Sequence, residues 1–377
     1  MDDLGNMPRI STQSTFMPTL KPRLISILLI LFAGVGVGLG TGCGNGLHLD
    51  PHPKRPVAEN LSRTEDLLSA PQLDLDSTAS PVFHPILSEQ NYEAVLQMND
   101  LSYAVVNDFG YSLGQSFPPT SQISKIRARL KDISQRLTAQ GWSSYQPILG
   151  RTGRDNVDPD ITAIVHTHTA QRLIVVAFHG SRSGSRNPSN DGHGDWGSNY
   201  DSTPVAPSEI GITEMPDSIR IHRGFGNNLA SARESLWAEL DARVEELGTQ
   251  APLWIWVTGH SKGGAMGGLA APMIKVHFAS KGQRFANVKV AGILFSSPRA
   301  VQGDPSQAWV HETVGRANLL RINVNGDPVT VALGRSATGY RSLGTLLSCR
   351  IGNCNPEDFP APDQPDQPHG AFRIGVA

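Results

Sequence analysis

Five apolar runs along the chain have the length and the β-branched content of buried strands. The first two are separated only by a short turn, which predicts a hairpin. Helical patterns fill the gaps between the later runs, and this alternation is typical of a mostly parallel sheet covered by helices on both faces. Ligands of such folds bind beyond the carboxyl ends of the strands, so chemistry is expected there. The predicted strands are 161–168, 172–178, 253–258, 288–295 and 319–324, and the predicted helices among them are 227–247 and 265–278.

Two further helices are predicted before the first strand, over 91–107 and 121–140. The second has Lys and Arg on one side and an apolar stripe on the other, which we interpret as a core-facing surface rather than a groove for a partner. The stripe consists of Ile123, Ile126, Leu130, Ile133 and Leu137.

An uncharged stretch over 24–42 follows Lys21 and Arg23 and ends in small residues, as a signal sequence does. The residues up to Cys43 resemble a bacterial lipoprotein box, so Cys43 is a lipidation candidate. Ordinary cleavage with secretion and an uncleaved anchor are the alternatives. We therefore expect an exported protein, secreted or held at the cell envelope by its signal or a lipid anchor.

The chain is expected to divide into three parts. The signal sequence with its cysteine occupies 1–43, and a flexible, proline-containing linker occupies 44–86. A single catalytic α/β domain then fills 87–377, a suitable length for one large unit.

Composition narrows the classes of function. Hydrophobic residues make up 39% and charged residues 18%, and 32 Lys and Arg stand against 34 Asp and Glu. This balance excludes a basic nucleic-acid binder, so no nucleic-acid partner is expected. In an exported protein, Cys349 and Cys354 are disulfide candidates, with two free buried thiols as the alternative.

A nucleophile candidate lies directly after the predicted strand 253–258. Gly259, His260, Ser261, Lys262 and Gly263 form the Gly-x-Ser-x-Gly pattern, and a predicted helix follows at once. The sharp turn forces the serine into a strained conformation and leaves no room for side chains two residues before and after it. Ser261 is therefore the predicted nucleophile, and His260 is expected to be a packing residue.

The serine needs a base, and the base needs an orienting acid, in the chain order Ser, Asp or Glu, His. Asp327 follows the predicted strand 319–324, and His369 is the one histidine after it. We predict Asp327 as the acid and His369 as the base. Asp304 is the alternative acid, in which case His311 becomes a possible second base.

Acyl transfer also needs two hydrogen-bond donors for the oxyanion. The backbone N–H of Lys262, directly after the nucleophile, is the expected first donor. The second is expected from the loop that begins with His179, Gly180 and Ser181 after the predicted strand 172–178.

With these segments in order, the chain resembles the fungal-type, or class 3, lipases of the α/β-hydrolase fold. The resemblance implies that Ser181 is the oxyanion residue and that lipid esters are the substrates. Lys262 departs from the family's usual Leu and puts a cation either near the site or against the helix. The other matching segments are Asp195 with Trp196, residues 222–225, residues 297–299 and residues 325–329.

The segment 183–200, where the family carries an amphipathic lid, is rich in Gly, Ser and Asn, so we expect no strong interfacial lid. A triacylglycerol lipase or esterase is the leading function, with phospholipase A activity or a non-catalytic, lipid-binding envelope protein as alternatives. We expect no cofactor and no metal. A metal site formed by His166 and His168 with His179 or His193 is the weaker idea, since histidines on an edge strand would explain the first two without an ion.

Overall fold

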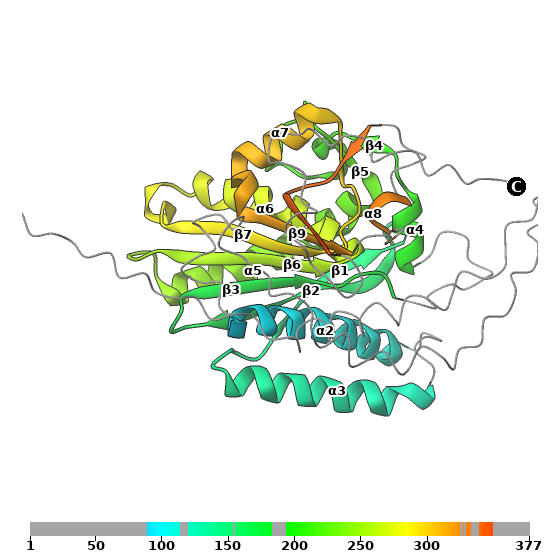
Figure 1. Cartoon of the computed structure of the whole chain (residues 1–377), viewed down its shortest axis with the longest axis vertical. Helices are drawn as coiled ribbons and strands as arrows, with labels where there is room; N and C mark the ends of the chain where they lie inside the picture. The colour runs from blue at the N-terminus through cyan, green and yellow to red at the C-terminus, as the bar shows by residue number, and fades with distance from the viewer. Residues whose placement is uncertain are drawn as a thin grey trace, which may run out of the picture.

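A seven-stranded sheet, in the order β1-β2-β3-β6-β7-β9-β11, forms the centre of the computed structural model (Figure 1). The structure describes residues 89–113, 120–153, 155–182, 194–324, 327, 329–332 and 339–349. Strands β1 to β3 pair antiparallel, and from β3 to β11 every neighbour is parallel. The predicted mostly parallel sheet and the predicted hairpin are thus confirmed. The strands are β1 (Gln146–Thr152), β2 (Asp158–His168), β3 (Leu173–Phe178), β6 (Leu253–His260), β7 (Val288–Phe295), β9 (Leu319–Val324) and β11 (Thr345–Cys349).

Both faces of the sheet are buried, because the central strands carry apolar residues on both faces. In β3, Ile174, Val176 and Phe178 pack into one hydrophobic cluster. Their neighbours Leu173, Val175 and Ala177 pack into another. A strand that faces two cores reads as a continuous apolar run, which is why the sequence revealed it.

Helices cover the two faces as predicted. On one side lie α2 (Glu89–Ser112) and α3 (Thr120–Ala139), with α3 as the outer layer (Figure 1). Ile133 and Leu137 of the predicted stripe on α3 are fully buried, so the stripe does face the core. On the other side lie α5 (Arg223–Leu247), α6 (Lys262–Ser280) and α7 (Gly303–Val314).

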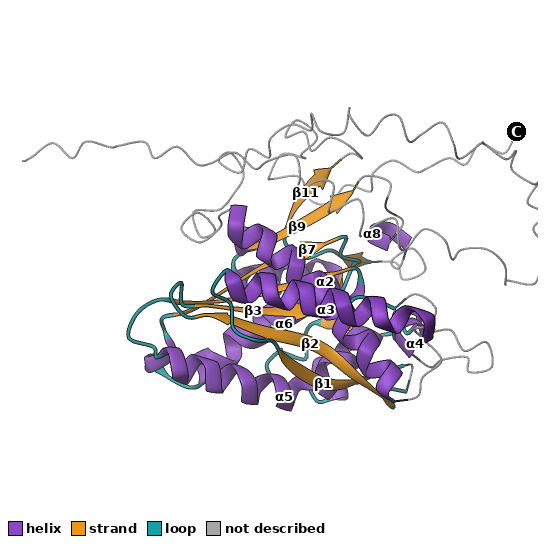
Figure 2. Cartoon of the chain, turned by 90° about the horizontal axis from the view of Figure 1, so that it is seen from below, coloured by secondary structure: helices purple, strands orange, loops and turns teal. Residues whose placement is uncertain are grey.

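Several short elements surround one end of the sheet. Helices α4 (Gly194–Tyr200) and α8 (Val329–Ala332) lie on the same side of the molecule in two views at right angles (Figures 1 and 2). A small second sheet runs in the order β10-β8-β5-β4. Its strands are β4 (Pro204–Val205), β5 (Arg220–His222), β8 (Val301–Gln302) and β10 (Tyr340–Arg341), and the 3-10 helices are η3 (Pro207–Ile210), η4 (Gln283–Phe285) and η5 (Arg316–Asn318).

Some predicted features lie outside the described residues: the signal sequence with Cys43, the linker, Cys354 and His369. Cys349 is the last residue of β11. Of the helices within the described ranges, none combines the length and the apolarity needed to span a bilayer.

Candidate active site

Ser261 occupies the turn between β6 and α6 in a strained backbone conformation, with φ 57° and ψ −126°. Positive φ is unusual for a residue with a side chain and persists only where the surroundings enforce it. Here the Ser261 N–H donates to the carbonyl of Phe295 at 3.0 Å, and its own carbonyl accepts from the N–H of Gly264 at 2.9 Å. The turn thus fixes the serine at the carboxyl end of a central strand.

The glycines on either side of Ser261 allow this turn to close. A Cβ on Gly259 would lie 2.3 Å from the carbonyl carbon of Gly263, and a Cβ on Gly263 would lie 2.3 Å from the oxygen of Phe178. Both contacts are with backbone atoms, which cannot rotate away. Only glycine fits at the two positions.

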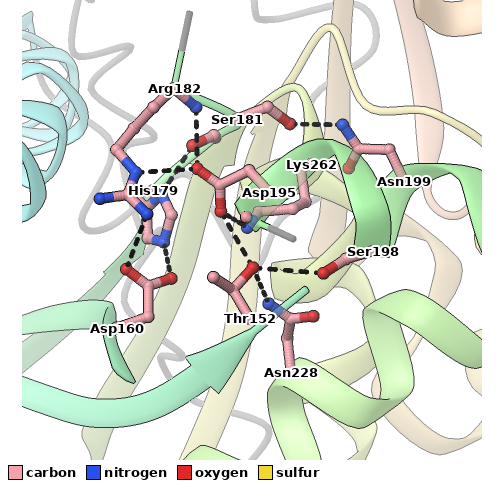
Figure 3. Close-up of polar contacts among 12 residues, drawn as sticks. Thr152, Asp160, His179, Ser181, Arg182, Asp195, Ser198, Asn199, Asn228 and Lys262 are labelled. Atoms are coloured by element: carbon pink, nitrogen blue, oxygen red, sulfur yellow. Dashed lines mark hydrogen bonds and ion pairs between the residues drawn. The ribbon is translucent and has the colours of Figure 1, made fainter. Parts of the chain in front are cut away.

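The loop after β3 packs directly against this turn. A Cβ on Gly180 would lie 2.5 Å from the backbone oxygen of His260, so the two backbones touch there. Ser181 follows, and its Oγ accepts a hydrogen bond from Nδ2 of Asn199 in α4 at 2.7 Å (Figure 3). The structure therefore brings Ser181, Ser261 and Lys262 to one end of the sheet.

The side chain of Lys262 is fully buried, and its Nζ lies 2.5 Å from Oδ1 of Asp195. The sequence left open whether this cation lies near the site or against the helix. In the structure it lies in the interior, in an ion pair with Asp195 of α4. Burial raises the pKa of Asp195, but the charges of Lys262 and Arg182 outweigh it and hold that pKa well below the usual range. Asp195 is therefore ionised at neutral pH.

Asp195 belongs to a larger buried cluster (Figure 3). Its Oδ2 accepts the backbone N–H of Arg182 at 2.9 Å and the Nε–H of the same residue at 3.0 Å. Oδ1 also accepts from the hydroxyl of Thr152 at 3.1 Å. Nearby, Oδ2 of Asp160 lies 2.8 Å from Nε2 of His179. The carboxylates of Asp160 and Asp195 thus face the buried cations of Arg182 and Lys262. This balance of charge offsets the cost of burying them.

Asp160, His179 and Asp195 each offer a ligand atom, and these atoms lie within 4.8 Å of one another. Arg182 and Lys262 already lie against the two carboxylates, however, so the group has the character of an ion-pair cluster rather than a cation site. Asp195 had only the family resemblance to indicate it, and Asp160 and Arg182 had no sequence signal. A Lys directly after the nucleophile, expected either near the site or against the helix, was the available hint that an acid must lie near.

Asp327 follows β9 and is partly buried, and its Oδ1 accepts the backbone N–H of Val329 at 2.9 Å. Burial lowers the pKa of His260 to about 4, and the charge of Asp327 acts against that shift. Asp327 therefore lies within electrostatic range of the residue before Ser261. The imidazole of His260 is buried and its Nδ1 lies 3.0 Å from Oη of Tyr103, consistent with a packing residue.

The alternative acid and base are engaged elsewhere. The side chain of Asp304 is 77% exposed at the start of α7 and pairs with Arg341. Nε2 of His311 accepts the backbone N–H of Gly344 at 3.0 Å. The assignment of the acid to Asp327 stays a prediction.

The interpretation of His166 and His168 as surface residues of an edge strand is wrong, because β2 lies between β1 and β3. His166 is 1% exposed, and its Nδ1 lies 3.0 Å from the oxygen of Ser143. Nε2 of His168 lies 3.2 Å from the oxygen of Gln140. Both imidazoles thus hold the loop before β1 in place.

A strained serine between a parallel strand and a helix, against the loop of a neighbouring strand, defines a protein of the α/β-hydrolase fold. Residues 175–336 match the family described as Lipase (class 3), which confirms the resemblance inferred from the motifs. The match supports a hydrolase of the lipase type. Among curated proteins, no sequence matches this chain.

Solved structures of fungal lipases are similar to this chain. A triacylglycerol lipase from Penicillium expansum is 16% identical, with a TM-score of 0.39 over 50% of this chain and 64% of its own. The chain thus spans just under two thirds of that lipase. A mono- and diacylglycerol lipase from Aspergillus oryzae is 20% identical, with a TM-score of 0.44 over 69% of this chain and 79% of its own. The Rhizomucor miehei lipase in complex with its propeptide is 18% identical, with a TM-score of 0.43 over 70% of each chain.

Proposed function

We propose that this protein is a serine carboxylic-ester hydrolase that acts on lipid esters. Ser261 Oγ attacks the ester carbonyl carbon while the imidazole of His369 takes the hydroxyl proton, and Asp327 orients that imidazole. His369 returns the proton to the departing alcohol, which leaves an acyl group on Ser261. Water, deprotonated by the same imidazole, then attacks the acyl carbonyl carbon; the bond to Ser261 Oγ breaks, the imidazole returns the proton to Oγ, and the acid is released.

The negative charge that develops on the carbonyl oxygen is bound by two donors in this mechanism. They are Ser181 and the backbone N–H of Lys262, which lie on two loops in direct contact. A preorganised pair of donors stabilises the transition state without moving during the reaction, and this is often the largest single contribution to acyl transfer.

The observation that carries the proposal is the backbone of Ser261. A φ of 57° in a residue with a side chain is a strain that the β6–α6 turn imposes and that the two flanking glycines make possible. In a nucleophile elbow this strain presents the serine Oγ beyond the carboxyl end of the strand, a conformation that an ordinary turn serine does not need. The charge of Asp327, which acts on the residue before Ser261, supports the same role.

Lipid esters follow from the match to class 3 lipases over 175–336. The proposed reaction is that of a triacylglycerol lipase or an esterase. The N-terminal assignments stay predictions: a signal sequence, lipidation at Cys43, and hence attachment to the cell envelope.

Hydrolysis of short-chain and long-chain nitrophenyl esters tests the proposal. Ser261→Ala is expected to reduce kcat by at least about 1,000-fold, because the nucleophile is lost while the fold is kept. Ser297→Ala is the matched control, since this buried serine beside α6 has no proposed role and its hydroxyl donates to the carbonyl of Pro298. A Ser261→Ala protein as active as the parent would overturn the assignment.

A further inference from the structure

The residue after the proposed nucleophile has its charged side chain in the interior. Lys262 is fully buried beneath the turn, with its Nζ on Oδ1 of Asp195. A buried ammonium is costly unless it is paired and hydrogen-bonded. The family's Leu at this position would fill the space at no such cost, so the lysine calls for a role of its own.

The carboxylate of Asp195 joins the two loops that present the oxyanion donors. One oxygen binds the side chain of Lys262, whose backbone N–H is the first donor. The other oxygen accepts the backbone N–H and the Nε–H of Arg182, the residue directly after Ser181. A single rigid group therefore bridges the elbow and the loop after β3 (Figure 3).

Helix α4 adds a second contact with the same loop. Asn199 lies one turn along the helix from Asp195, and its Nδ2 donates to Oγ of Ser181 at 2.7 Å. Both residues are buried. The helix thus fixes the backbone after Ser181 through Asp195 and the hydroxyl of Ser181 through Asn199.

Oxyanion stabilisation depends on the distance between the two donors, because both must lie about 2.7–3.1 Å from one oxygen atom. The contacts of Asp195 set that distance from outside the hole. Its four hydrogen bonds, from Lys262, Thr152 and two from Arg182, occupy its acceptor positions. No freedom remains for the carboxylate to rotate and let one loop move alone.

We propose that Asp195 and Lys262 are positioning residues that hold the two halves of the oxyanion hole in register. The inference rests on the proposed ester hydrolysis. Neither side chain touches the substrate: the pair acts through the backbone N–H of Lys262 and through Ser181.

Asp195→Asn tests the inference with almost no change in shape. The amide of asparagine cannot accept at both ends, so either Lys262 or the Arg182 N–H loses its partner. We expect kcat on a nitrophenyl ester to fall about 10- to 100-fold, since misplacement of a donor by a fraction of an ångström weakens the transition state selectively. KM is expected to stay within about threefold, because the substrate's ground state does not use the hole.

The affinity for a boronic acid distinguishes a positioning role from a merely structural one. Phenylboronic acid forms a tetrahedral adduct on the serine whose oxygen occupies the oxyanion hole, so its affinity should fall by the same factor as kcat. If Asp195→Asn proves too unstable to isolate, the double variant Asp195→Asn with Lys262→Met, which removes one charge of each sign, carries the same test.

The matched control is another ion pair with a buried carboxylate, Glu214 with Arg233, whose atoms lie 2.8 Å apart. Glu214→Gln is expected to lower the thermal unfolding temperature but to leave kcat and boronate affinity within about twofold. A folded Asp195→Asn variant, or the double variant, with unchanged kcat and unchanged boronate affinity would overturn the inference.

Ser261→Ala, assayed in parallel, separates the two failures. If it retains ester hydrolysis, the proposed function itself is wrong, and with it the inference. If it abolishes hydrolysis while the Asp195 variants remain fully active, only the positioning role is wrong.

Discussion

Two glycines of α6, four residues apart, should respond differently to alanine. Gly263 belongs to the elbow, where an added Cβ would lie 2.3 Å from the oxygen of Phe178 and 2.8 Å from the carbonyl carbon of His179. Gly267 lies one turn further, where the nearest atom is Cδ2 of Leu294 at 3.2 Å, the end of a flexible side chain. Alanine favours the helix over glycine by about 1 kcal/mol at either position.

The difference between the two positions comes from the clash. A carbon and a backbone oxygen need roughly 1 Å more than 2.3 Å, so Gly263→Ala must push β3 away from α6. Overpacking of this kind costs about 1–3 kcal/mol, and a clash with backbone atoms falls in the upper part of that range, about 2–3 kcal/mol, which exceeds the gain in helix propensity. We expect a net destabilisation of about 1–2 kcal/mol, equivalent to a fall of roughly 2–8 °C in Tm for a domain of this size.

Activity should fall more steeply than stability. The end of β3 leads into Ser181, so a displacement of that strand by about 1 Å moves the oxyanion loop and can cost about 100-fold in kcat. Thermal unfolding and ester hydrolysis on parent, Gly263→Ala and Gly267→Ala measure both effects. Gly267→Ala is expected to keep full activity and a Tm no lower than the parent's, because the gain in helix propensity is opposed only by a small shift of the Leu294 side chain. Equal Tm and equal activity for Gly263→Ala and the parent would refute this account of the elbow.

Two further predictions concern stability. Burial lowers the pKa of His166, His222 and His260 to about 4, so below pH 6.5 the unfolded chain binds protons that the folded chain does not, and stability falls as the pH drops from 6.5 to 4. His222→Asn keeps an N-cap acceptor for Phe225. Between pH 4 and 6.5, its free energy of unfolding, measured in urea, should change with pH by about 1.4 kcal/mol per unit less than that of the parent. An unchanged slope would contradict the burial of a neutral imidazole. Arg172 donates to four carbonyl oxygens at the end of α5 and in the loop after it. Arg172→Lys cannot reach them all, so it should lower the free energy of unfolding by about 1–3 kcal/mol in the same assay. A loss near zero would show that water replaces these bonds.

The sequence predicted those parts of the fold in which burial follows a simple period. All five strands predicted from apolar runs form, and the helices α5 and α6 begin only a few residues earlier than predicted. Strand β1 was missed because it lies at the edge of the sheet, contains Pro147 and Gly150, and alternates irregularly between buried and exposed residues. Without β1, the strand 161–168 was taken for an edge, and the burial of His166 was missed with it.

The candidate site likewise has a part that the sequence predicted and a part that it did not. Ser261 and its glycines were recognisable because the elbow is local, with all its requirements within five residues. The cluster around Asp195 was not, because Asp160, Arg182 and Lys262 meet only after β2, the loop after β3, α4 and α6 have packed together. Pairing across such distances follows from the tertiary fold and leaves no period in the sequence.

The central claim, that Ser261 is an activated nucleophile, is tested most directly by covalent labelling. A fluorophosphonate probe reacts with a serine whose hydroxyl is activated by a base, and ordinary serines stay unmodified. Mass spectrometry of the labelled full-length protein, followed by peptide mapping, should show one adduct, on Ser261, and no adduct in Ser261→Ala. An unlabelled parent protein, or an adduct on another serine, would contradict the account.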